Sequence, residues 1–391
     1  MRTLLVGLST RAMAESAHRG SYDVVSVDYF GDYDQKLLVP NYSLLRDLGT
    51  NFQVSLLGEI AFQIDFDALA YTSNLENYPE IVEKLAAKGA ILGNSPSVLR
   101  EIRDWDRLSF FLRAEGFKVP RTLEEPPGSS GRWVKKPLHS GGGHKISFYL
   151  HGEEVAENFV VQEYLEGIPS SASFVADGRR AVVISLTEQL IGRAEFGISP
   201  FRYCGNILPL RIAGKDEAYL REILEQVQQM VDRITFHFGL KGVNGLDFIL
   251  RDGEIYALEI NPRYSASMEL IEMAYGINIF DLHVRACQGE LPSFSLEERF
   301  PASLFFGKAI LFAEKDITVG DTRGWVARGI RDVPFPGDKI KRGQPICTLL
   351  ATARGREECL SKLVAQAQEL KRVLVSLQKA EFQYLAPILS I

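Results

Sequence analysis

The sequence has few cysteines and no long uncharged apolar run. Its four cysteines, at positions 204, 287, 347 and 359, are far apart and form no CxxC pair, which argues against a zinc site or a disulfide framework. A membrane-spanning helix needs about 18 or more consecutive apolar residues, and no segment approaches that length. The first residues read as a short strand and a polar turn rather than as a signal peptide. These absences predict a cytoplasmic protein without a membrane partner.

A tract of one charge sign is also missing. The 44 Lys and Arg and the 50 Asp and Glu residues give a net charge of -6 and are spread along the chain. Since no basic tract is available to neutralise a phosphate backbone, nucleic acid is not expected as a partner. The remaining composition, 46% hydrophobic and 24% charged, is that of a globular protein. A length of 391 residues predicts two or three domains.

The first hundred residues alternate between short apolar strands and amphipathic helices. This alternation predicts a parallel, Rossmann-like sheet in an N-terminal domain over residues 1–103. The expected elements are helices at 11–19 and 79–88 and strands at 3–8, 22–27, 66–71 and 90–92.

Short strands dominate after the loop EEPPGSSG at 124–131, which marks a boundary. Together with a long helix at 215–238 they predict an α+β core up to about residue 300. The remainder, 301–391, reads as a small β-rich accessory domain that ends in a helix at 356–378. That domain could cover an active site or form a subunit interface, which would make the protein a homodimer. The expected core strands are 133–136, 146–150, 159–164, 173–176, 181–186, 243–250 and 255–260.

A lysine pair precedes a loop with three consecutive glycines in the run WVKKPLHSGGGH at 133–144. Glycines let backbone N–H groups approach an anion closely, and a lysine supplies a compact positive charge, so the run favours phosphate binding. The lysine precedes the glycines, which differs from the Walker motif. A hairpin that needs glycine only for its turn is the alternative. The candidate phosphate-binding residues are Lys135, Lys136, Ser140, Gly141, Gly142 and Gly143.

Two acidic strands follow about a hundred residues later. The tight turn at 251–253 makes 243–250 and 255–260 antiparallel neighbours, and side chains two residues apart share a face. Glu259 and Asn261 should therefore project together and meet Asp247. Three hard oxygen ligands, completed by water and nucleotide phosphates, suit Mg2+, with Mn2+ as a substitute. Arg263 could then clamp an acyl-phosphate or its oxyanion. A solvated hairpin is the alternative.

Taken together, these segments resemble the ATP-grasp superfamily over about residues 1–300. The resemblance implies a glycine-loop lobe at 104–170 and a metal-binding catalytic lobe at 171–300, and the fragments VGLSTRAMAESA and VDYFGD resemble a branch described as predicted ATP-dependent carboligases, related to biotin carboxylase. It also implies that VQEYLEG, at 161–167, is the linker that binds the adenine of ATP. The adenine-binding residues implied are Glu163, Tyr164, Leu165 and Glu166.

Several positions depart from the superfamily pattern. Lys136 is assigned to the phosphates because it precedes Pro137, although strand alternation could favour Lys135. Arg107 stands where a second phosphate-contacting lysine is common. Ser170 or Glu166 replaces the usual ribose-binding carboxylate. The residues after Arg263 lack the Gln-Val-Glu-His run of biotin carboxylases, which makes carboxylation the less favoured reaction.

The implied activity is an ADP-forming carboxylate-amine ligase that uses ATP and Mg2+. A small-molecule carboxylate would attack the γ-phosphate, and an amine would then attack the acyl-phosphate, with Lys136 and Arg263 as catalytic residues. An amine carboxylase acting through carboxyphosphate and a non-enzymatic nucleotide-binding module are the alternatives. Substrate contacts are expected at the carboxyl ends of the N-terminal strands and on the segment 202–206. The candidates are Ser9, Arg11, Glu15, Ser16, Asp28, Phe30, Asp32, Glu76, Asn77, Tyr203 and Asn206.

Overall fold

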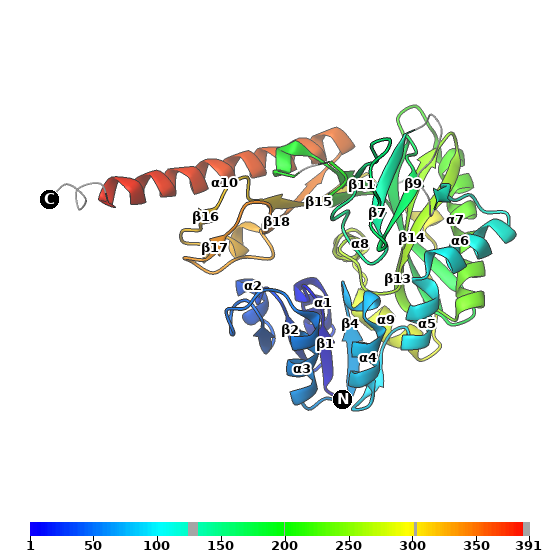
Figure 1. Cartoon of the computed structure of the whole chain (residues 1–391), viewed down its shortest axis with the longest axis horizontal. Helices are drawn as coiled ribbons and strands as arrows, with labels where there is room; N and C mark the ends of the chain where they lie inside the picture. Colours follow the sequence, from blue (N-terminus) through cyan, green and yellow to red (C-terminus); the bar gives the residue numbers. More distant parts are fainter. Residues whose placement is uncertain (124–131, 199, 301–302, 386–391) are drawn as a thin grey trace.

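The computed structural model describes residues 1–123, 132–198, 200–300 and 303–385, with side chains up to residue 374. The predicted loop at 124–131 lies outside these residues. Figure 1 shows the N-terminal domain below a large central sheet, and the last helix extends away from both. Within the described ranges, no helix combines the length and apolar character required to cross a bilayer.

The N-terminal domain is a parallel sheet of five strands in the order β3-β2-β1-β4-β5. This confirms the predicted Rossmann-like sheet, although each of the four predicted strands is one or two residues shorter in the structure. Short apolar strands such as TLLV, buried at every position, form because helices cover both faces of such a sheet. The strands are β1 (Thr3–Val6), β2 (Val24–Asp28), β3 (Asn41–Ser43), β4 (Ala68–Tyr71) and β5 (Ala90–Ile91); the helices are α1 (Arg11–Arg19), α2 (Tyr33–Lys36), α3 (Val54–Gln63), η1 (Leu75–Asn77), α4 (Pro79–Ala86) and α5 (Pro96–Ile102).

A second, smaller sheet follows the helix α6 (Trp105–Ala114). Its four strands are antiparallel in the order β6-β9-β7-β8. Asp104 caps α6 by accepting hydrogen bonds from the N–H groups of Asp106 and Arg107, which explains why the helix begins there. The strands are β6 (Thr122–Leu123), β7 (Trp133–Pro137), β8 (Ser147–Phe148) and β9 (Phe159–Glu163).

The central sheet is antiparallel, with seven strands in the order β14-β13-β10-β11-β12-β15-β18. The strands are β10 (Ile168–Asp177), β11 (Ala181–Ile191), β12 (Tyr203–Leu208), β13 (Lys241–Arg251), β14 (Glu254–Asn261), β15 (Phe305–Phe312) and β18 (Pro345–Ala353). The boundary predicted at residue 300 thus falls inside one sheet, because β15 pairs with β12.

The remaining elements lie around this sheet. Four helices pack against it or beside it, and two short strands pair with each other near the C-terminal end. These elements are η2 (Ala194–Phe196), α7 (Glu217–Phe238), α8 (Met268–Tyr275), α9 (Ile279–Cys287), η3 (Glu297–Arg299), β16 (Ile317–Thr318), η4 (Val326–Arg328), β17 (Lys339–Ile340) and α10 (Arg356–Leu385).

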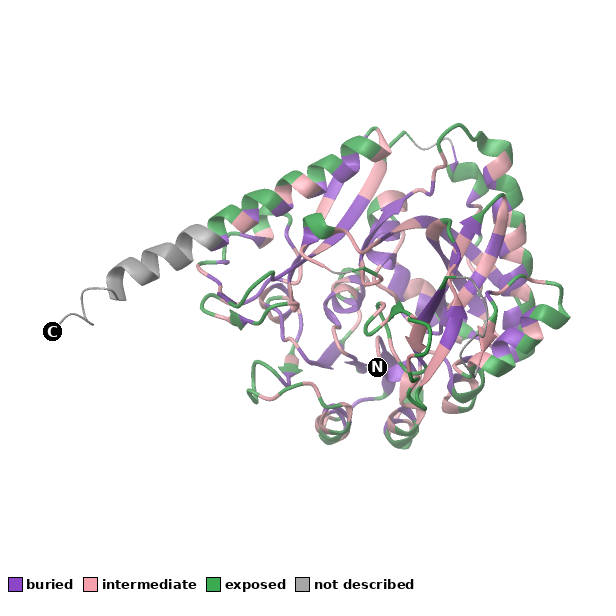
Figure 2. Ribbon diagram, turned by 45° about the horizontal axis from the view of Figure 1, so that its top comes forward, coloured by how far each residue is buried: buried purple, intermediate pink, exposed green. Residues whose placement is uncertain are grey.

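The two faces of the central sheet differ in chemistry. On β10, Ala172, Phe174 and Ala176 pack with α7 in one apolar cluster, whereas Val175 packs with α9 and the N-terminal domain in another. Ser171 and Ser173 alternate with the first set and so face the N-terminal domain. Figure 2 shows buried residues throughout the sheet and along one side of α10. The face toward the N-terminal domain therefore carries polar side chains inside the protein.

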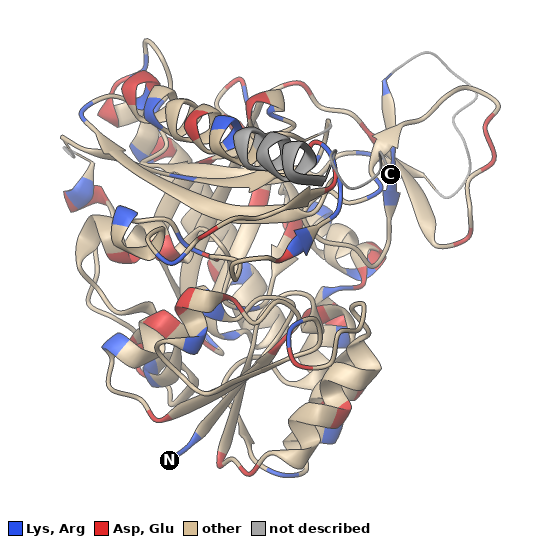
Figure 3. Ribbon diagram, turned by 90° about the vertical axis from the view of Figure 1, so that its left-hand side faces the viewer, with Lys and Arg blue, Asp and Glu red and all other residues tan. Residues whose placement is uncertain are grey.

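Charged residues of both signs are interspersed over the ribbon in Figure 3. Some of them are buried where the N-terminal domain meets α8 and the loop after η4. Arg11, at the start of α1, is 1% exposed and forms ion pairs with Glu15, Glu269 and Asp332. This buried charge cluster holds the three regions together.

Candidate active site

Asp247 on β13 and Glu259 on β14 lie directly opposite each other, and both side chains face the N-terminal domain. The Asn261 amide donates a hydrogen bond to Asp247 Oδ2 at 3.0 Å. Gln189, on β11, donates to the other oxygen, Oδ1, at 3.0 Å. The structure therefore brings together the three residues that strand alternation had suggested as metal ligands. Gln189 was not predicted, because nothing in its local sequence shows that β11 lies two strands from β13.

The electrostatics of this pair fit a divalent cation. Burial and the neighbouring Glu259 carboxylate raise the pKa of Asp247 to about 7. Burial also disfavours charge on Glu259, but Lys136, Arg103 and Arg263 outweigh it and lower its pKa. A divalent cation between the two carboxylates would remove their repulsion. No group of three or more His, Cys, Asp or Glu side chains suited to a metal occurs within the described residues, so Asn261, water and phosphate oxygens would complete the coordination.

Lys136 lines a narrow cleft between the four-stranded sheet and β14. Its Nζ atom lies 3.3 Å from the carbonyl oxygen of Leu258, and burial lowers its pKa. Lys135 points to the other side of β7 and pairs with Glu153. Of the two lysines, the structure thus directs Lys136 toward Glu259. The cleft is also lined by Ile102, Arg103, Val160, Gln162, Leu258 and Glu259.

A second cation in the cleft is Arg103, just after α5. Its guanidinium donates to Asn77 Oδ1 at 3.0 Å, to the carbonyl oxygen of Ile260 at 3.1 Å and to that of Ser140 at 3.4 Å. It also lies 3.5 Å from Glu259. Arg107, the predicted phosphate contact, is instead exposed on the outer side of α6, near Glu101 and Asp104. The cation in the cleft is instead Arg103, which follows the end of the preceding helix, α5. Sequence spacing alone did not show which of the two arginines would face the cleft.

The glycine loop rests on the start of β12. The carbonyl oxygen of Gly142 accepts a hydrogen bond from the N–H of Tyr203 at 3.1 Å. Gly143 has a φ of +69°, and a Cβ atom there would overlap the carbonyl oxygen of Phe201. Ser140 donates to the carbonyl oxygen of His144 at 3.1 Å. Glycine is therefore required at position 143 both by conformation and by close approach.

The predicted adenine linker follows β9. Glu163 accepts hydrogen bonds from Arg121, and Glu166 pairs with Arg132 on the surface. Leu165 is buried, and Tyr164 packs edge-on against Phe148 and Phe201. Ser170 is fully buried and donates to the carbonyl oxygen of Ile168, so its hydroxyl is not presented to a ribose in this conformation.

Most of the residues predicted to bind substrate instead form hydrogen bonds with other residues of the site. Glu76, 2% exposed, accepts from Arg263 Nε at 2.8 Å, and Asn77 accepts from Arg103. Arg263 also donates to Asn261 at 2.9 Å, so it connects the candidate metal ligands to the N-terminal domain. The structure places Arg11 differently from our expectation, because the buried acids described above engage its guanidinium.

Three other predicted substrate contacts lie beside the site. Tyr203 donates to Asn206, which in turn donates to Thr187 at 2.9 Å. Ser9 contributes its carbonyl oxygen to Thr72 at 2.9 Å. Tyr203 and Asn206 are on the polar face of the central sheet and remain candidates for substrate contact.

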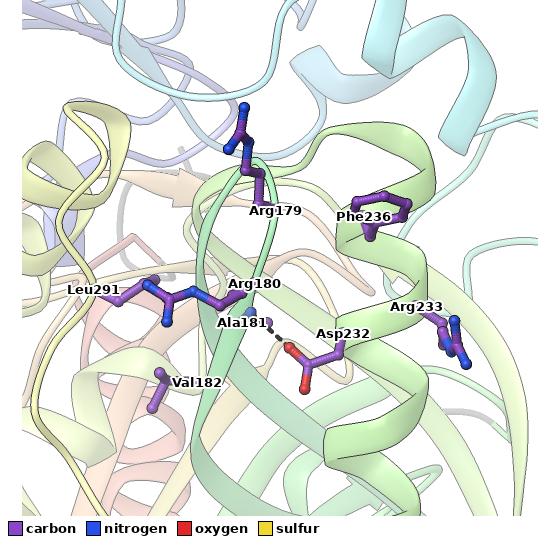
Figure 4. Close-up of a pocket in the computed structure, with 8 residues that line it drawn as sticks. All are labelled: Arg179, Arg180, Ala181, Val182, Asp232, Arg233, Phe236 and Leu291. Carbon is purple, nitrogen blue, oxygen red and sulfur yellow. Dashed lines mark hydrogen bonds between the residues drawn. The ribbon is translucent and has the colours of Figure 1, made fainter.

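A separate hollow lies between α7 and the β10–β11 hairpin. Figure 4 shows Arg179, Arg180 and Arg233 at its edge, with guanidinium groups that point in different directions. Asp232 accepts a hydrogen bond from the N–H of Ala181 at 2.8 Å. Because the three cations do not converge, this hollow lacks the convergent geometry found around Glu259.

Residues 105–267 match the family model described as an ATP-grasp domain. The match identifies these residues as an ATP-grasp domain, and the chain has the ATP-grasp fold. Among individual proteins, it is similar to an uncharacterised protein of Methanocaldococcus jannaschii, with 25% identity over 376 residues that cover 90% of this chain and 88% of that protein. It is also 23% identical over 261 residues to the carbamoyl phosphate synthase large chain of Thermoplasma acidophilum, of which it spans 23% of the length.

Solved structures share the fold at low identity. The L-amino acid ligase of Bacillus licheniformis superposes with a TM-score of 0.68 at 16% identity, covering 94% of this chain and 97% of that one. The biotin carboxylase domain dimer of Hydrogenobacter thermophilus 2-oxoglutarate carboxylase, solved with MgADP and bicarbonate, gives a TM-score of 0.68 at 14% identity, covering 92% and 88%. At these identities the likeness shows the fold alone.

Proposed function

We propose that this protein is an ATP- and Mg2+-dependent ligase that activates a carboxylate as an acyl-phosphate and joins it to an amine. The observation that supports this most directly is the convergence of Asp247, Glu259 and Asn261 with three cations, Lys136, Arg103 and Arg263. Paired acids held beside several buried cations suit a reaction in which phosphate charge moves between oxygens. The site thus provides both a metal position and separate counter-charges.

Each group has a distinct role in the proposed reaction. Asp247, Glu259 and Asn261 would hold Mg2+, which supplies charge neutralisation for the nucleotide phosphates. Lys136 and Arg103 line the cleft and would neutralise charge on the nucleotide phosphates. Arg263, held by Glu76, would stabilise negative charge on the acyl group.

The reaction has two balanced steps. A substrate carboxylate oxygen forms a bond to the γ-phosphorus as the bond to the ADP oxygen breaks. The amine nitrogen then bonds to the acyl carbon, loses its proton to solvent or a base, and inorganic phosphate leaves. The products are an amide, ADP and phosphate.

We infer that the small sheet moves when the nucleotide binds, because the cleft beside Lys136 is narrow and ATP would enter between the four-stranded sheet and β14. A movement of that sheet and its glycine loop away from β14 would widen the cleft. Such a movement would break the backbone hydrogen bond between the glycine loop and β12 and the hydrogen bonds from Arg103 to Ser140 and from Lys136 to Leu258.

Hydroxylamine trapping tests the proposal without knowledge of the amine. The protein is incubated with ATP, Mg2+, hydroxylamine and pools of carboxylic acids, and ADP and hydroxamate are measured. We expect both products in equal amounts with the correct acid. Glu259→Gln should lower the rate by more than about 100-fold, since even changes behind a metal ligand cost about 10- to 100-fold.

Two outcomes distinguish the competing functions. ADP formation that depends on bicarbonate, with no hydroxamate from any other acid, would indicate an amine carboxylase instead. Folded protein that binds no MgATP or MgADP would overturn the enzymatic proposal and favour a different role for the fold.

A further inference from the structure

A row of buried polar side chains crosses the face of the central sheet that meets the N-terminal domain. Ser171 lies opposite Asp247 and shares a hydrogen bond of 2.9 Å with Thr187 on the next strand. Asn206 donates to Thr187, and Lys308 lies directly opposite Asn206 on β15. Lys308 is 3% exposed and donates to Glu269 at 2.7 Å. The row therefore runs from the candidate metal site to the buried charge cluster around Arg11.

One carboxyl oxygen in that cluster has no hydrogen-bond partner among the described residues. Asp32 stands at the N-cap of α2 and is 9% exposed, but its side chain does not cap the helix. Its Oδ2 atom accepts no hydrogen bond from the described residues. Its neighbours are satisfied: Asp28 accepts from Thr10 and Gly31, and Asp34 accepts from the N–H groups of Asp332 and Val333.

The charges around Asp32 are predominantly negative. Burial, followed by Asp332, Asp34 and Asp28, raises its pKa, while Arg11 acts in the opposite direction. Arg11 is hydrogen-bonded to Glu269 and Asp332, and Lys308 to Glu269, so both nearby cations already have partners. Proteins rarely bury a carboxyl group without a hydrogen-bond donor or a cation. A missing cation is the simplest complement to this group.

The position of Asp32 relates it to the candidate active site. It follows β2, and Glu76 and Asn77 follow β4, so all three lie at the carboxyl edge of the parallel sheet, where ligands bind in such folds. In the order β2-β1-β4 the two strands are two spacings apart, which is on the order of 10 Å. Arg263 is held at the β4 side by Glu76.

We propose that Asp32 anchors a subsite for a cationic group of the substrate, an ammonium or guanidinium that does not react. The substrate is then an amino-acid-like carboxylate whose reacting end lies at Arg263 and whose cationic end lies on the order of 10 Å away. This inference rests on the proposed function, because the reacting carboxylate defines one end of the substrate. The polar row on the central sheet, whose side chains are buried, links the regions of these two ends.

Paired ligands with and without the distant amine test the subsite. Binding of 6-aminohexanoate and 8-aminooctanoate is compared with that of hexanoate and octanoate, by calorimetry in the presence of MgADP. We expect at least one amino acid of the pair to bind wild-type protein about 10-fold more tightly than its deaminated analogue, and Asp32→Asn to abolish the difference. The matched control is Asp23→Asn, which makes the same change at the exposed, opposite end of β2 and should keep the preference.

Thermal melting tests whether Asp32 has only a structural role. Since Asp32 is an unpartnered buried acid, Asp32→Asn should melt at the same temperature as the wild type or a few degrees higher without ligand. A lower melting temperature together with an unchanged preference for the amine would overturn the subsite. Potassium or sodium ions that raise the melting temperature only when Asp32 is present, without any preference for the amine, would assign the position to an inorganic cation and also overturn it.

The nucleotide in the same samples separates the two proposals. If Glu259→Gln weakens MgADP binding but Asp32→Asn changes the binding of no ligand, only the cationic subsite is overturned. If the wild-type protein does not bind MgADP, the result contradicts the proposed function itself.

Discussion

Arg103 contacts β14, the glycine loop and the N-terminal domain at once. We expect Arg103→Ala to raise the KM for ATP and to lower kcat, by about 10- to 1000-fold together, because it removes a preorganised cation from the phosphate site. Steady-state kinetics and MgADP binding measure both effects. Arg107→Ala is the control: its side chain is exposed and its ion pairs are long, so the change should stay within about twofold. Equal losses in the two variants would contradict the assignment.

His283 makes the stability of the protein depend on pH. Its Nδ1 atom accepts a hydrogen bond from the N–H of Val243 and its Nε2 atom lies 3.0 Å from the carbonyl oxygen of Leu92, an arrangement that requires a neutral ring. Burial lowers its pKa from 6.5 to about 4. The unfolded chain therefore takes up a proton first as the pH falls, so stability is full above about pH 6.5 and is lost between pH 6.5 and 4, by roughly 3 kcal/mol.

Urea unfolding at a series of pH values measures this dependence. His283→Gln should be less stable at pH 7 but should show a flatter slope between pH 6.5 and 4. His151→Gln, at an exposed position, should keep the slope of the wild type. A wild-type slope in the His283 variant would show that other groups cause the acid sensitivity.

At the scale of the elements, one glycine of the loop should tolerate substitution less well than its neighbours. Gly143→Ala would place a Cβ atom against Phe201 in a left-handed conformation, whereas Gly141 has open space around it and no positive φ. We expect Gly143→Ala to prevent the loop from docking on β12 and to lower kcat about 10-fold or more, since the loss of docking geometry exceeds the roughly 1 kcal/mol of the backbone conformation alone. Gly141→Ala should retain most activity. Comparable kcat values for the two variants would refute a docked loop in the reaction.

The elements also show what the sequence could predict. The turn at 251–253 fixes the register of β13 and β14, so alternation alone sufficed to bring Asp247, Glu259 and Asn261 together. The sequence alone could not decide whether Lys136 or Lys135 faces the cleft, because that depends on which face of β7 is covered. Arg103 escaped prediction because a residue at a helix end has no periodic pattern. The strands β15 and β18 appeared to form a separate domain because a local sequence does not tell which sheet edge a hairpin will join.

At the scale of the whole molecule, Arg11 joins the N-terminal domain to α8 and to the loop at 330–333. Arg11→Met would leave the buried Glu269 and the partly exposed Asp332 without their main partner, so we expect a loss of about 3–5 kcal/mol in the free energy of unfolding. Arg46→Met removes an exposed ion pair, with Asp338, across the same contact and should cost about 1 kcal/mol or less. Urea unfolding followed by tryptophan fluorescence measures both values. A similar small cost for both variants would mean that the buried cluster does not hold these regions together.

The central sheet pairs strands that are synthesised at widely separated times. β12 ends at Leu208, but its neighbour β15 begins at Phe305 and the last strand, β18, ends at Ala353. At a translation rate of about 5–20 residues per second, the 104 residues between Leu208 and Phe312, the end of β15, take roughly 5 to 21 s to emerge. During that interval the edge of β12 that pairs with β15 is unpaired on the ribosome and Lys308 is not yet in the polar row. Nascent chains of this intermediate length are therefore the ones we expect chaperones to bind.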